Sequence, residues 1–234
     1  MSETLSEQAT RAKLLVVDDH AFLREGIKAI LHRDASLEVV GEAQDGQQAL
    51  ECCRELRPEL VLMDVSMPEM DGIEATRKIK TEFPQTSVLI FTAHADHRLL
   101  VDAVKAGAAG YLLKGGDIKH VLDAVRAVLD GETPLEHEEV TQLLSRLARE
   151  AGPRKTPPSG VAPESLENNL SSQETEVLRL IATGKTNRQV AQQLLISLSS
   201  VKTYVQRIIK KLEVSDRTQA SVRAVELGLL PERE

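Results

Sequence analysis

Aromatic side chains are scarce in this chain of 234 residues, which holds three Phe, two Tyr and no Trp. The hydrophobic core must therefore be mainly aliphatic, and stacking of nucleic-acid bases on aromatic rings is disfavoured as a binding mode. Hydrophobic residues make up 41% of the chain and charged residues 28%, which is the balance of an ordinary globular protein. The length suits one or two domains.

Cysteine and long apolar runs are also scarce. The two cysteines, Cys52 and Cys53, are adjacent, which suits neither a disulfide nor a metal site. We interpret them as reduced thiols, with a redox role as the alternative. No apolar run approaches the roughly 18 residues that span a bilayer, and the first segment, MSETLSEQATRAK, lacks the apolar centre of a signal peptide. We therefore expect a cytoplasmic protein that does not insert into membranes.

Charge is unevenly distributed along the chain. The formal net charge is −7, but residues 171–234 hold ten Lys or Arg and seven Asp or Glu, which makes them net positive by three. Residues 1–170 are net negative by ten. This asymmetry is a weak indication that the C-terminal segment faces nucleic acid.

Short apolar runs alternate with helical periodicity over the first 130 residues. The runs predict strands at 13–17, 38–43, 60–64, 87–92 and 110–114. The segments between and after them predict helices near 21–33, 46–56, 71–81, 97–106 and 117–130. This alternation is typical of βαβ units with a parallel sheet buried on both faces. We predict a doubly wound α/β domain with five parallel strands.

The rest of the chain shows only helical patterns. A helix is predicted at 136–149, and a linker with four Pro and two Gly follows at 151–165. Four short helices then form a small all-α domain, and they are predicted at 172–183, 187–194, 198–212 and 216–227. Their predicted caps are the capping boxes SSQE (171–174) and TNRQ (186–189), Ser197 and Ser215. The predicted domains are 12–131 and 170–231, joined by 132–169.

Polar side chains end four of the predicted strands. They are Asp18, Asp19, Asp64, Thr92 and Lys114. Ligands of an open parallel sheet bind at this edge, where we expect these side chains to reach solvent. Three carboxylates would repel one another there, and Mg²⁺, which prefers oxygen ligands, would remove that repulsion. The alternative for Asp18 or Asp19 alone is a helix cap.

Four segments resemble the receiver domains of bacterial two-component response regulators. They are LLVVDDH (14–20), LVLMDVSMPEMDG (60–72), IFTAH (90–94) and GAAGYLLKG (107–115), in that order. The resemblance implies a flavodoxin-like five-stranded fold. It implies that Asp64 accepts a phosphoryl group from the phosphohistidine of a sensor histidine kinase. It also implies that Asp19 and Asp64 bind Mg²⁺ directly. Asp18 would bind the ion through water, and the Ser66 carbonyl would be a further ligand.

The same resemblance assigns roles around the phosphoryl group. Lys114 would pair with this group, and Thr92 would move toward it. Tyr111 matches the aromatic switch position of the family, and a strand residue packed on a helix is an equally compatible interpretation. Ser66 and His94 stand where the family varies.

The segment ISLSSVKTYVQRIIKKLEV (196–214) predicts a helix with one apolar and one basic face. The apolar stripe consists of Leu198, Val201, Val205, Ile208 and Leu212. Such a helix suits the major groove of DNA, where Lys contacts guanine or phosphate and Gln pairs with adenine. Taken alone, a solvated basic surface helix is the stronger interpretation. Together with the helix at 187–194, it forms a helix-turn-helix whose second helix reads DNA.

Residues 170–220 resemble the LuxR-type DNA-binding domain along their whole length. The candidate DNA contacts are Lys202, Thr203, Gln206, Arg207, Lys210, Ser200, Asn187 and Arg217. Tyr204 and Gln173 depart from the family, where His and Arg are usual. Gln206 stands at a base-contacting position where relatives often carry Lys, so relatives' operators are no guide to this one. Helix 216–227 corresponds to the family's dimerisation helix.

A receiver followed by a LuxR-type domain is the arrangement of NarL/FixJ-type response regulators. The resemblance implies a transcription regulator, not an enzyme with an external substrate, that forms homodimers on promoter DNA. One alternative is a constitutive DNA-binding regulator with a non-phosphorylated receiver. Another is a phosphatase or mutase with an Asp nucleophile, but such enzymes usually carry a second acid at the position of Ser66.

Overall fold

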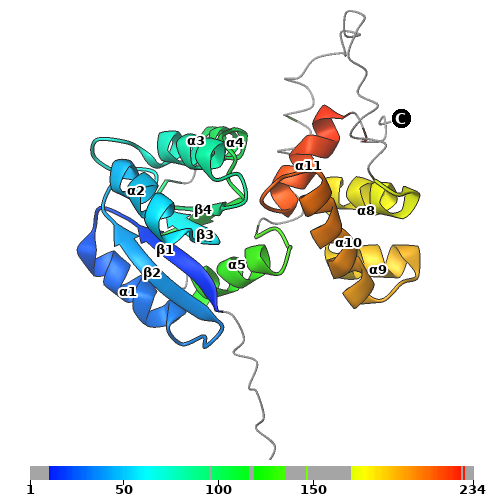
Figure 1. Ribbon diagram of the computed structural model, residues 1–234, viewed down its shortest axis with the longest axis horizontal. Coiled ribbons are helices and arrows are strands. Elements are labelled where there is room, and N and C mark those ends of the chain that lie inside the picture. The colour runs from blue at the N-terminus through cyan, green and yellow to red at the C-terminus, as the bar shows by residue number, and fades with distance from the viewer. Residues whose placement is uncertain are drawn as a thin grey trace, which may run out of the picture.

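The computed structural model describes residues 11–94, 96–115, 119–134, 146, 170–227 and 229. Within these ranges the chain forms an N-terminal domain with a sheet and a helical C-terminal domain (Figure 1). The predicted helix at 136–149 and the linker at 151–165 lie outside the described residues, except at position 146.

Five parallel strands form the sheet, in the spatial order β2-β1-β3-β4-β5. The strands are β1 (Ala12–Val17), β2 (Leu37–Ala43), β3 (Leu60–Met63), β4 (Ser87–Thr92) and β5 (Gly110–Leu113). Each bound lies within one residue of the prediction. The last residue of β1, Val17, pairs with Ala43 of β2 and with Met63 of β3. The carboxyl ends of the central strands therefore meet at one edge of the sheet.

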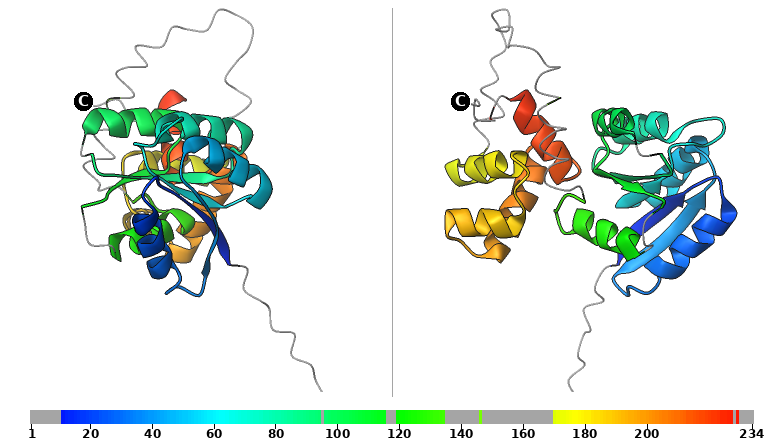
Figure 2. Two further views of the ribbon diagram at one scale, coloured as in Figure 1. Left: turned by 90° about the vertical axis from the view of Figure 1, so that its left-hand side faces the viewer. Right: turned by 180° about the vertical axis from the view of Figure 1, so that it is seen from behind.

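Helices cover both faces of the sheet, which confirms the doubly wound prediction (Figures 1 and 2). The helices α1 (Ala21–Leu31) and α5 (Lys119–Leu129) share one apolar cluster with Leu14 of β1. The helices α2 (Gly46–Leu56), α3 (Gly72–Glu82) and α4 (His97–Ala106) share the other cluster with Leu15. Successive strand residues point to opposite faces, so both faces of β1 are buried in aliphatic core.

The helical domain contains α8 (Ser172–Ala182), α9 (Asn187–Leu194), α10 (Leu198–Lys211) and α11 (Arg217–Glu226). Both predicted capping boxes form, and Ser197 caps α10 as expected. The predicted cap of the last helix was wrong by one residue. Asp216 caps α11 by accepting the backbone N–H of Gln219 at 3.0 Å, and the Ser215 hydroxyl donates to the same carboxylate. A carboxylate oxygen is a stronger acceptor than a hydroxyl oxygen.

The adjacent cysteines are free thiols. Cys53 is fully buried in the core between α2 and the sheet, and burial raises the pKa of its thiol to about 12. A thiol with so high a pKa is a weak nucleophile, so a redox role for Cys53 is disfavoured. Among the helices that the structure describes, none is both long enough and apolar enough to cross a bilayer.

Candidate functional site

Two acidic side chains lie buried where β1 and β3 end. Asp18 and Asp64 are 1% and 3% exposed, and the Asp64 N–H donates to the Val17 carbonyl at 2.9 Å. The expectation that the side chains at this edge reach solvent was therefore wrong for Asp18 and Asp64, and also for Thr92, which is fully buried. Of the three acids, only Asp19 is exposed.

Lys114, which follows β5, compensates the charge of both buried carboxylates. Its Nζ lies 2.6 Å from Asp18 Oδ2 and 2.7 Å from Asp64 Oδ2. The other oxygens accept backbone N–H groups, from His20 to Asp18 at 2.8 Å and from Val65 to Asp64 at 2.7 Å. Burial lowers the pKa of Lys114, but its bonds to the two carboxylates outweigh this and raise the pKa above its usual value. Paired and hydrogen-bonded in this way, the acids remain stable in a buried site.

The residues at this edge fit a divalent cation. Asp18, Asp19 and His20 offer ligand atoms that lie within 4.8 Å of one another. Asp64 lies close to this group, because the Lys114 ammonium contacts both Asp64 and Asp18. Ser66 is exposed in the loop that follows β3. One ammonium pairs with Asp18 and Asp64, and Asp19 adds a third carboxylate beside Asp18. Carboxylate oxygens are the ligands that Mg²⁺ prefers. Asp18, Asp19 and Asp64 are therefore the residues that can supply oxygen ligands.

The loop after Asp64 requires glycine where it joins α3. A Cβ atom on Gly72 would lie 1.9 Å from the Asp64 carbonyl oxygen, which is backbone and has no room to move aside. The Gly72 N–H also donates to the Val65 carbonyl at 2.9 Å. The glycine thus lets α3 begin against the backbone of the candidate nucleophile.

Thr92 and Tyr111 are both joined to His94. The Thr92 hydroxyl, which is fully buried at the end of β4, accepts the His94 N–H at 3.3 Å. The Tyr111 hydroxyl donates to the His94 carbonyl, and burial raises the pKa of the phenol. Both interpretations of Tyr111 therefore stay compatible with its position. No pattern in the sequence indicates that His94 links these residues.

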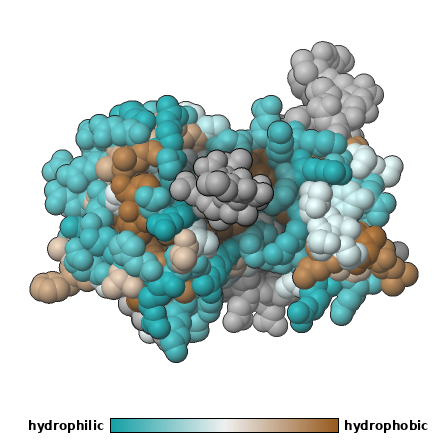
Figure 3. Space-filling model, turned by 60° about the horizontal axis from the view of Figure 1, so that its bottom comes forward, coloured by the Kyte–Doolittle hydropathy of each residue, from teal (hydrophilic) through white to brown (hydrophobic). Residues whose placement is uncertain are grey.

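The candidate DNA-reading helix α10 packs on the helical core through its apolar stripe. Val201, Val205, Ile208 and Leu212 are buried, as predicted. Leu198 is 43% exposed, so its predicted burial was wrong; it opens the first turn of α10, beyond the reach of the core. Leu195, on the turn before α10, is 91% exposed. Figure 3 shows an apolar patch at the outer end of this domain and another apolar area over the N-terminal domain.

The polar candidates on α10 lie outside this apolar stripe. Thr203, Gln206, Arg207 and Lys210 are exposed, and Ser200 and Lys202 are partly exposed. The basic face that the sequence predicts is therefore present on the surface of the helical domain.

Asn187 and Arg217, the two remaining candidate DNA contacts, are buried inside the helical domain. The Arg217 guanidinium donates to Asn187 Oδ1 at 2.6 Å and also to the Lys185 carbonyl. Burial lowers the pKa of Arg217 to about 10, so the side chain is charged at neutral pH. These contacts join the start of α9 to the start of α11, which favours a structural role.

The helix α11 lies on the side of the helical domain that faces the N-terminal domain (Figures 1 and 2). Polar contacts of its side chains join the two domains. The Thr218 hydroxyl donates to the Ala109 carbonyl at 2.5 Å. Gln219 Nε2 donates to the carbonyls of Ala108 at 2.8 Å and Val104 at 3.3 Å. These two side chains of α11 therefore bind the last turn of α4 and its connection to β5.

An apolar contact adds to this interface. Val222 of α11 packs against a cluster on α4 that consists of Leu100, Val101 and Val104, and Tyr111 packs against the same cluster. This cluster is separate from the two cores that flank the sheet. It connects the surface beside Tyr111 with the helical domain.

Two acids after α5 contact candidate DNA-binding residues. Asp130 Oδ2 lies 3.0 Å from Lys202 Nζ. Glu132 accepts the Asn187 N–H at 3.2 Å and lies 3.7 Å from Arg217 Nη1. The sequence analysis did not predict these contacts, because no sequence motif indicates which residue an acid near a domain boundary will contact.

Comparisons with known proteins agree with both domains. Residues 14–126 match the model of the response regulator receiver domain, and residues 168–224 match that of bacterial regulatory proteins of the luxR family. Transcriptional regulatory protein LiaR of Bacillus subtilis is 39% identical over 212 residues, which are 91% of this chain and 96% of LiaR. Response regulator protein VraR of Staphylococcus aureus is 38% identical over 93% of this chain and 98% of VraR.

A solved structure is similar to the N-terminal domain. It is the isolated REC domain of RcsB from Salmonella enterica serovar Typhimurium, in the presence of the phosphomimetic BeF3⁻. The similarity has a TM-score of 0.52 at 26% identity, over 57% of this chain and 99% of that chain. One conclusion follows from the order of the two matched domains, from the five-stranded sheet and from the relatives that match over nearly their whole length. The chain belongs to the NarL/FixJ-type two-component response regulators, in which a receiver domain precedes a LuxR-type helix-turn-helix domain that binds DNA.

Proposed function

We propose that Asp64 is the phosphoacceptor of this response regulator. An oxygen of its carboxylate attacks the phosphorus of a phosphohistidine on a sensor histidine kinase. The new phosphorus–oxygen bond forms as the phosphorus–nitrogen bond breaks, and the released imidazole takes a proton from water. The observation that carries the proposal is the contact of Asp64 with Lys114, whose ammonium lies 2.7 Å from the carboxylate and can pair with an arriving phosphoryl group.

The three acids at this edge hold Mg²⁺ in the proposed reaction. Asp19 and Asp64 would bind it directly, Asp18 would bind it through water, and the Ser66 carbonyl would be a further ligand. A bound Mg²⁺ neutralises charge on the transferred group. The domain modifies itself, and water later removes the phosphoryl group, so we propose no external substrate and no enzyme in the usual sense.

Phosphorylation changes the contacts of Lys114 and Thr92 in this proposal. Lys114 exchanges Asp18 for the phosphoryl group, and the Thr92 hydroxyl turns from the His94 N–H toward the same group. This change reaches Tyr111 through His94, because the Tyr111 hydroxyl donates to the His94 carbonyl. The ring of Tyr111 packs on the α4 cluster that also contacts α11, so a change at Asp64 reaches the interface between the domains.

The interface itself restrains DNA binding in the unphosphorylated protein. Lys202, a candidate DNA contact, is paired with Asp130, and α11, the proposed dimerisation helix, is held against the receiver. We propose that phosphorylation weakens these contacts and favours a homodimer on two half-sites of promoter DNA in the cytoplasm. The residues proposed to contact DNA on α10 are Lys202, Thr203, Gln206, Arg207, Lys210 and Ser200.

Intact mass after incubation with Mg²⁺ and acetyl phosphate tests the phosphoacceptor. We expect one added phosphoryl group in the wild type and none in Asp64→Ala, because the acceptor oxygen is lost. Ser66→Ala is the matched control, since it removes a hydroxyl of the neighbouring loop and should be phosphorylated like the wild type. Addition to Asp64→Ala, or none to the wild type, would contradict the assignment.

A further inference from the structure

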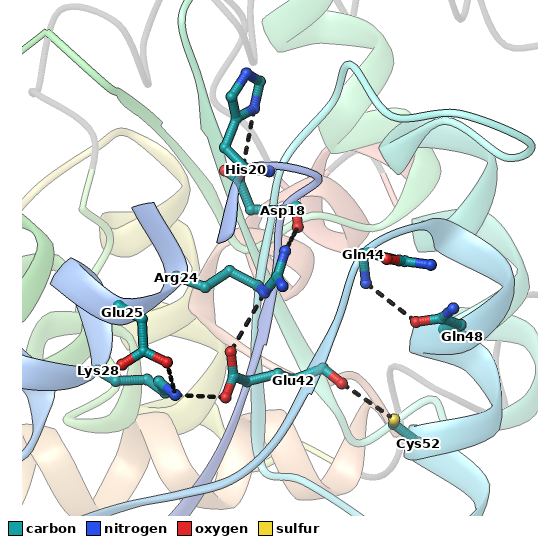
Figure 4. A network of polar contacts seen from close by, with 9 residues as sticks. All are labelled: Asp18, His20, Arg24, Glu25, Lys28, Glu42, Gln44, Gln48 and Cys52. Carbon is teal, nitrogen blue, oxygen red and sulfur yellow. Dashed lines mark hydrogen bonds and ion pairs between the residues drawn. The ribbon is translucent and has the colours of Figure 1, made fainter. Parts of the chain in front are cut away.

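The Arg24 guanidinium contacts the backbone of the acidic edge at Asp18 (Figure 4). One end of its guanidinium, Nη1, donates to the carbonyl oxygen of Asp18 at 2.6 Å. The Nε atom donates to Glu42 Oε2 at 3.2 Å. The Arg24 side chain is only 16% exposed. It therefore joins the end of β1 to β2 from its place in the second turn of α1.

Glu42 is itself held in place. It lies on β2 opposite Val16 of β1, and its Oε1 is 2.5 Å from Lys28 Nζ. The hydrogen bond from Lys28 lowers the pKa of Glu42, so Glu42 is a carboxylate at neutral pH. Lys28 also contacts Glu25 at 2.7 Å, as Figure 4 shows. The guanidinium of Arg24 thus has a fixed anchor on the side away from Asp18.

The contact with Arg24 controls the direction of Asp19. The peptide group between Asp18 and Asp19 is planar, so fixing its carbonyl oxygen fixes its whole plane. The N–H of Asp18 is fixed as well, by the Ala43 carbonyl at 3.1 Å. The Asp19 side chain is 33% exposed, and its carboxylate contacts His20 Nδ1 at 2.6 Å. The direction in which the Asp19 side chain leaves the backbone therefore depends on the peptide that Arg24 holds, and the contact with His20 acts on its far end.

We infer that Arg24 is a positioning residue for the Mg²⁺ site, because it orients the Asp18–Asp19 peptide so that the Asp19 carboxylate points toward the metal. This inference rests on the proposed function, in which Asp19 binds the ion directly. Loss of a group that orients a metal ligand typically weakens metal affinity ten-fold to a hundred-fold. Arg24 never touches the phosphoryl group or the ion itself.

An effect of charge alone would change the Mg²⁺ affinity of Arg24→Met in the opposite direction. The direction of the change therefore tests the inference. Arg24 is a cation beside an acidic cluster, so its removal should strengthen the attraction of Mg²⁺ if only Coulomb forces mattered. Lys28 carries the same charge on the same helix and binds the same Glu42, but it makes no contact with Asp18. Lys28→Met is therefore the matched control for Arg24→Met.

The experiment is a calorimetric titration of the full chain with MgCl₂ at fixed ionic strength. We expect Arg24→Met to raise the Kd for Mg²⁺ about ten-fold, and Lys28→Met to leave it unchanged or slightly lower. Arg24→Lys keeps the charge but loses the two-pronged contact, so its Kd should lie between those of the wild type and Arg24→Met. Phosphorylation by acetyl phosphate should need more Mg²⁺ in Arg24→Met, yet reach nearly the wild-type rate when Mg²⁺ is saturating.

Two results would overturn the inference. The first is a Kd in Arg24→Met equal to or lower than that of the wild type, and the second is an equal weakening in Lys28→Met. Thermal unfolding without Mg²⁺ tells whether Arg24→Met is folded, and Arg24→Lys gives the readout if it is not. Failure of the proposed function differs from these results, because the wild type itself would then neither bind Mg²⁺ nor take up a phosphoryl group.

Discussion

Lys114→Met is expected to lower the free energy of unfolding of the receiver domain by about 3 kcal/mol when Mg²⁺ is absent. Removal of one partner from a buried ion pair costs this much, because the remaining charge is left unpaired. Here two carboxylates lose their partner, since Lys114 lies within 2.7 Å of both Asp18 and Asp64. Urea unfolding in EDTA, followed by circular dichroism, measures the change.

Added Mg²⁺ should restore part of the stability that Lys114→Met loses. The ion binds the folded acidic edge and not the unfolded chain, so its binding free energy adds to folding. The midpoint of unfolding should therefore rise more with Mg²⁺ in this variant than in the wild type. Lys114→Arg keeps the charge and serves as the control. Wild-type stability of Lys114→Met in EDTA would show that the buried acids do not depend on this ion pair.

Val101→Asp is expected to open the interface between the domains without phosphorylation. Val101 is 5% exposed and belongs to the α4 cluster on which Val222 packs. A carboxylate in this contact costs about 3 kcal/mol, which lowers the ratio of closed to open protein roughly a hundred-fold. The unphosphorylated variant should then bind promoter DNA at least about ten-fold more tightly than the unphosphorylated wild type. Fluorescence anisotropy with a duplex selected from a random-sequence library measures this affinity.

The Val101→Asp substitution changes neither the phosphorylation site at Asp64 nor the DNA-reading face of α10. Val101 belongs to a cluster separate from the two receiver cores, and it is on the receiver rather than on the DNA-binding domain. Asp102→Asn changes an exposed residue of the same helix by one charge and should bind DNA like the wild type. DNA affinity unchanged in Val101→Asp would mean that the α4–α11 contact does not restrain the DNA-binding domain.

The sheet and most helix ends follow from local patterns, so the sequence predicts them well. Runs such as LLVV (14–17) are too apolar for any place except a doubly covered sheet, and the observed strands match them within one residue. The pattern S-x-x-E at 171–174 specifies the cap that α8 adopts. Helix bounds differ from the prediction by at most two residues, because the choice between neighbouring cap residues, such as Ser215 and Asp216, depends on local hydrogen bonds.

Burial of the acids could not be predicted in the same way. Asp64 stays inside the domain because Lys114, fifty residues further along the chain, pairs with it. A strand pattern describes only the strand and says nothing about a compensating charge on another element. The exposure of Leu198 has a similar origin, since helical spacing places it on the apolar stripe although the core ends before it.

The contacts between the domains carry the least signal in the sequence. Gln219 donates to the Ala108 carbonyl, which is more than a hundred residues away in the sequence. Every residue has a backbone carbonyl, so the residue type gives no indication of such a contact. Arg24 was missed for the same reason, because its partner is the backbone oxygen of Asp18. A sequence motif can name the residues of a site, whereas the backbone groups that orient them need a structure.

DNA affinity before and after phosphorylation tests the central claim most directly. The duplex selected above would be titrated with wild type and Asp64→Asn, each with and without prior treatment by acetyl phosphate and Mg²⁺. We predict that treatment tightens binding by the wild type at least about ten-fold and leaves Asp64→Asn unchanged, because only the wild type gains the group that alters Lys114, Thr92 and the α4 surface. Equal affinity of the treated and untreated wild type, with stoichiometric phosphorylation shown by mass, would contradict the claim that Asp64 controls DNA binding.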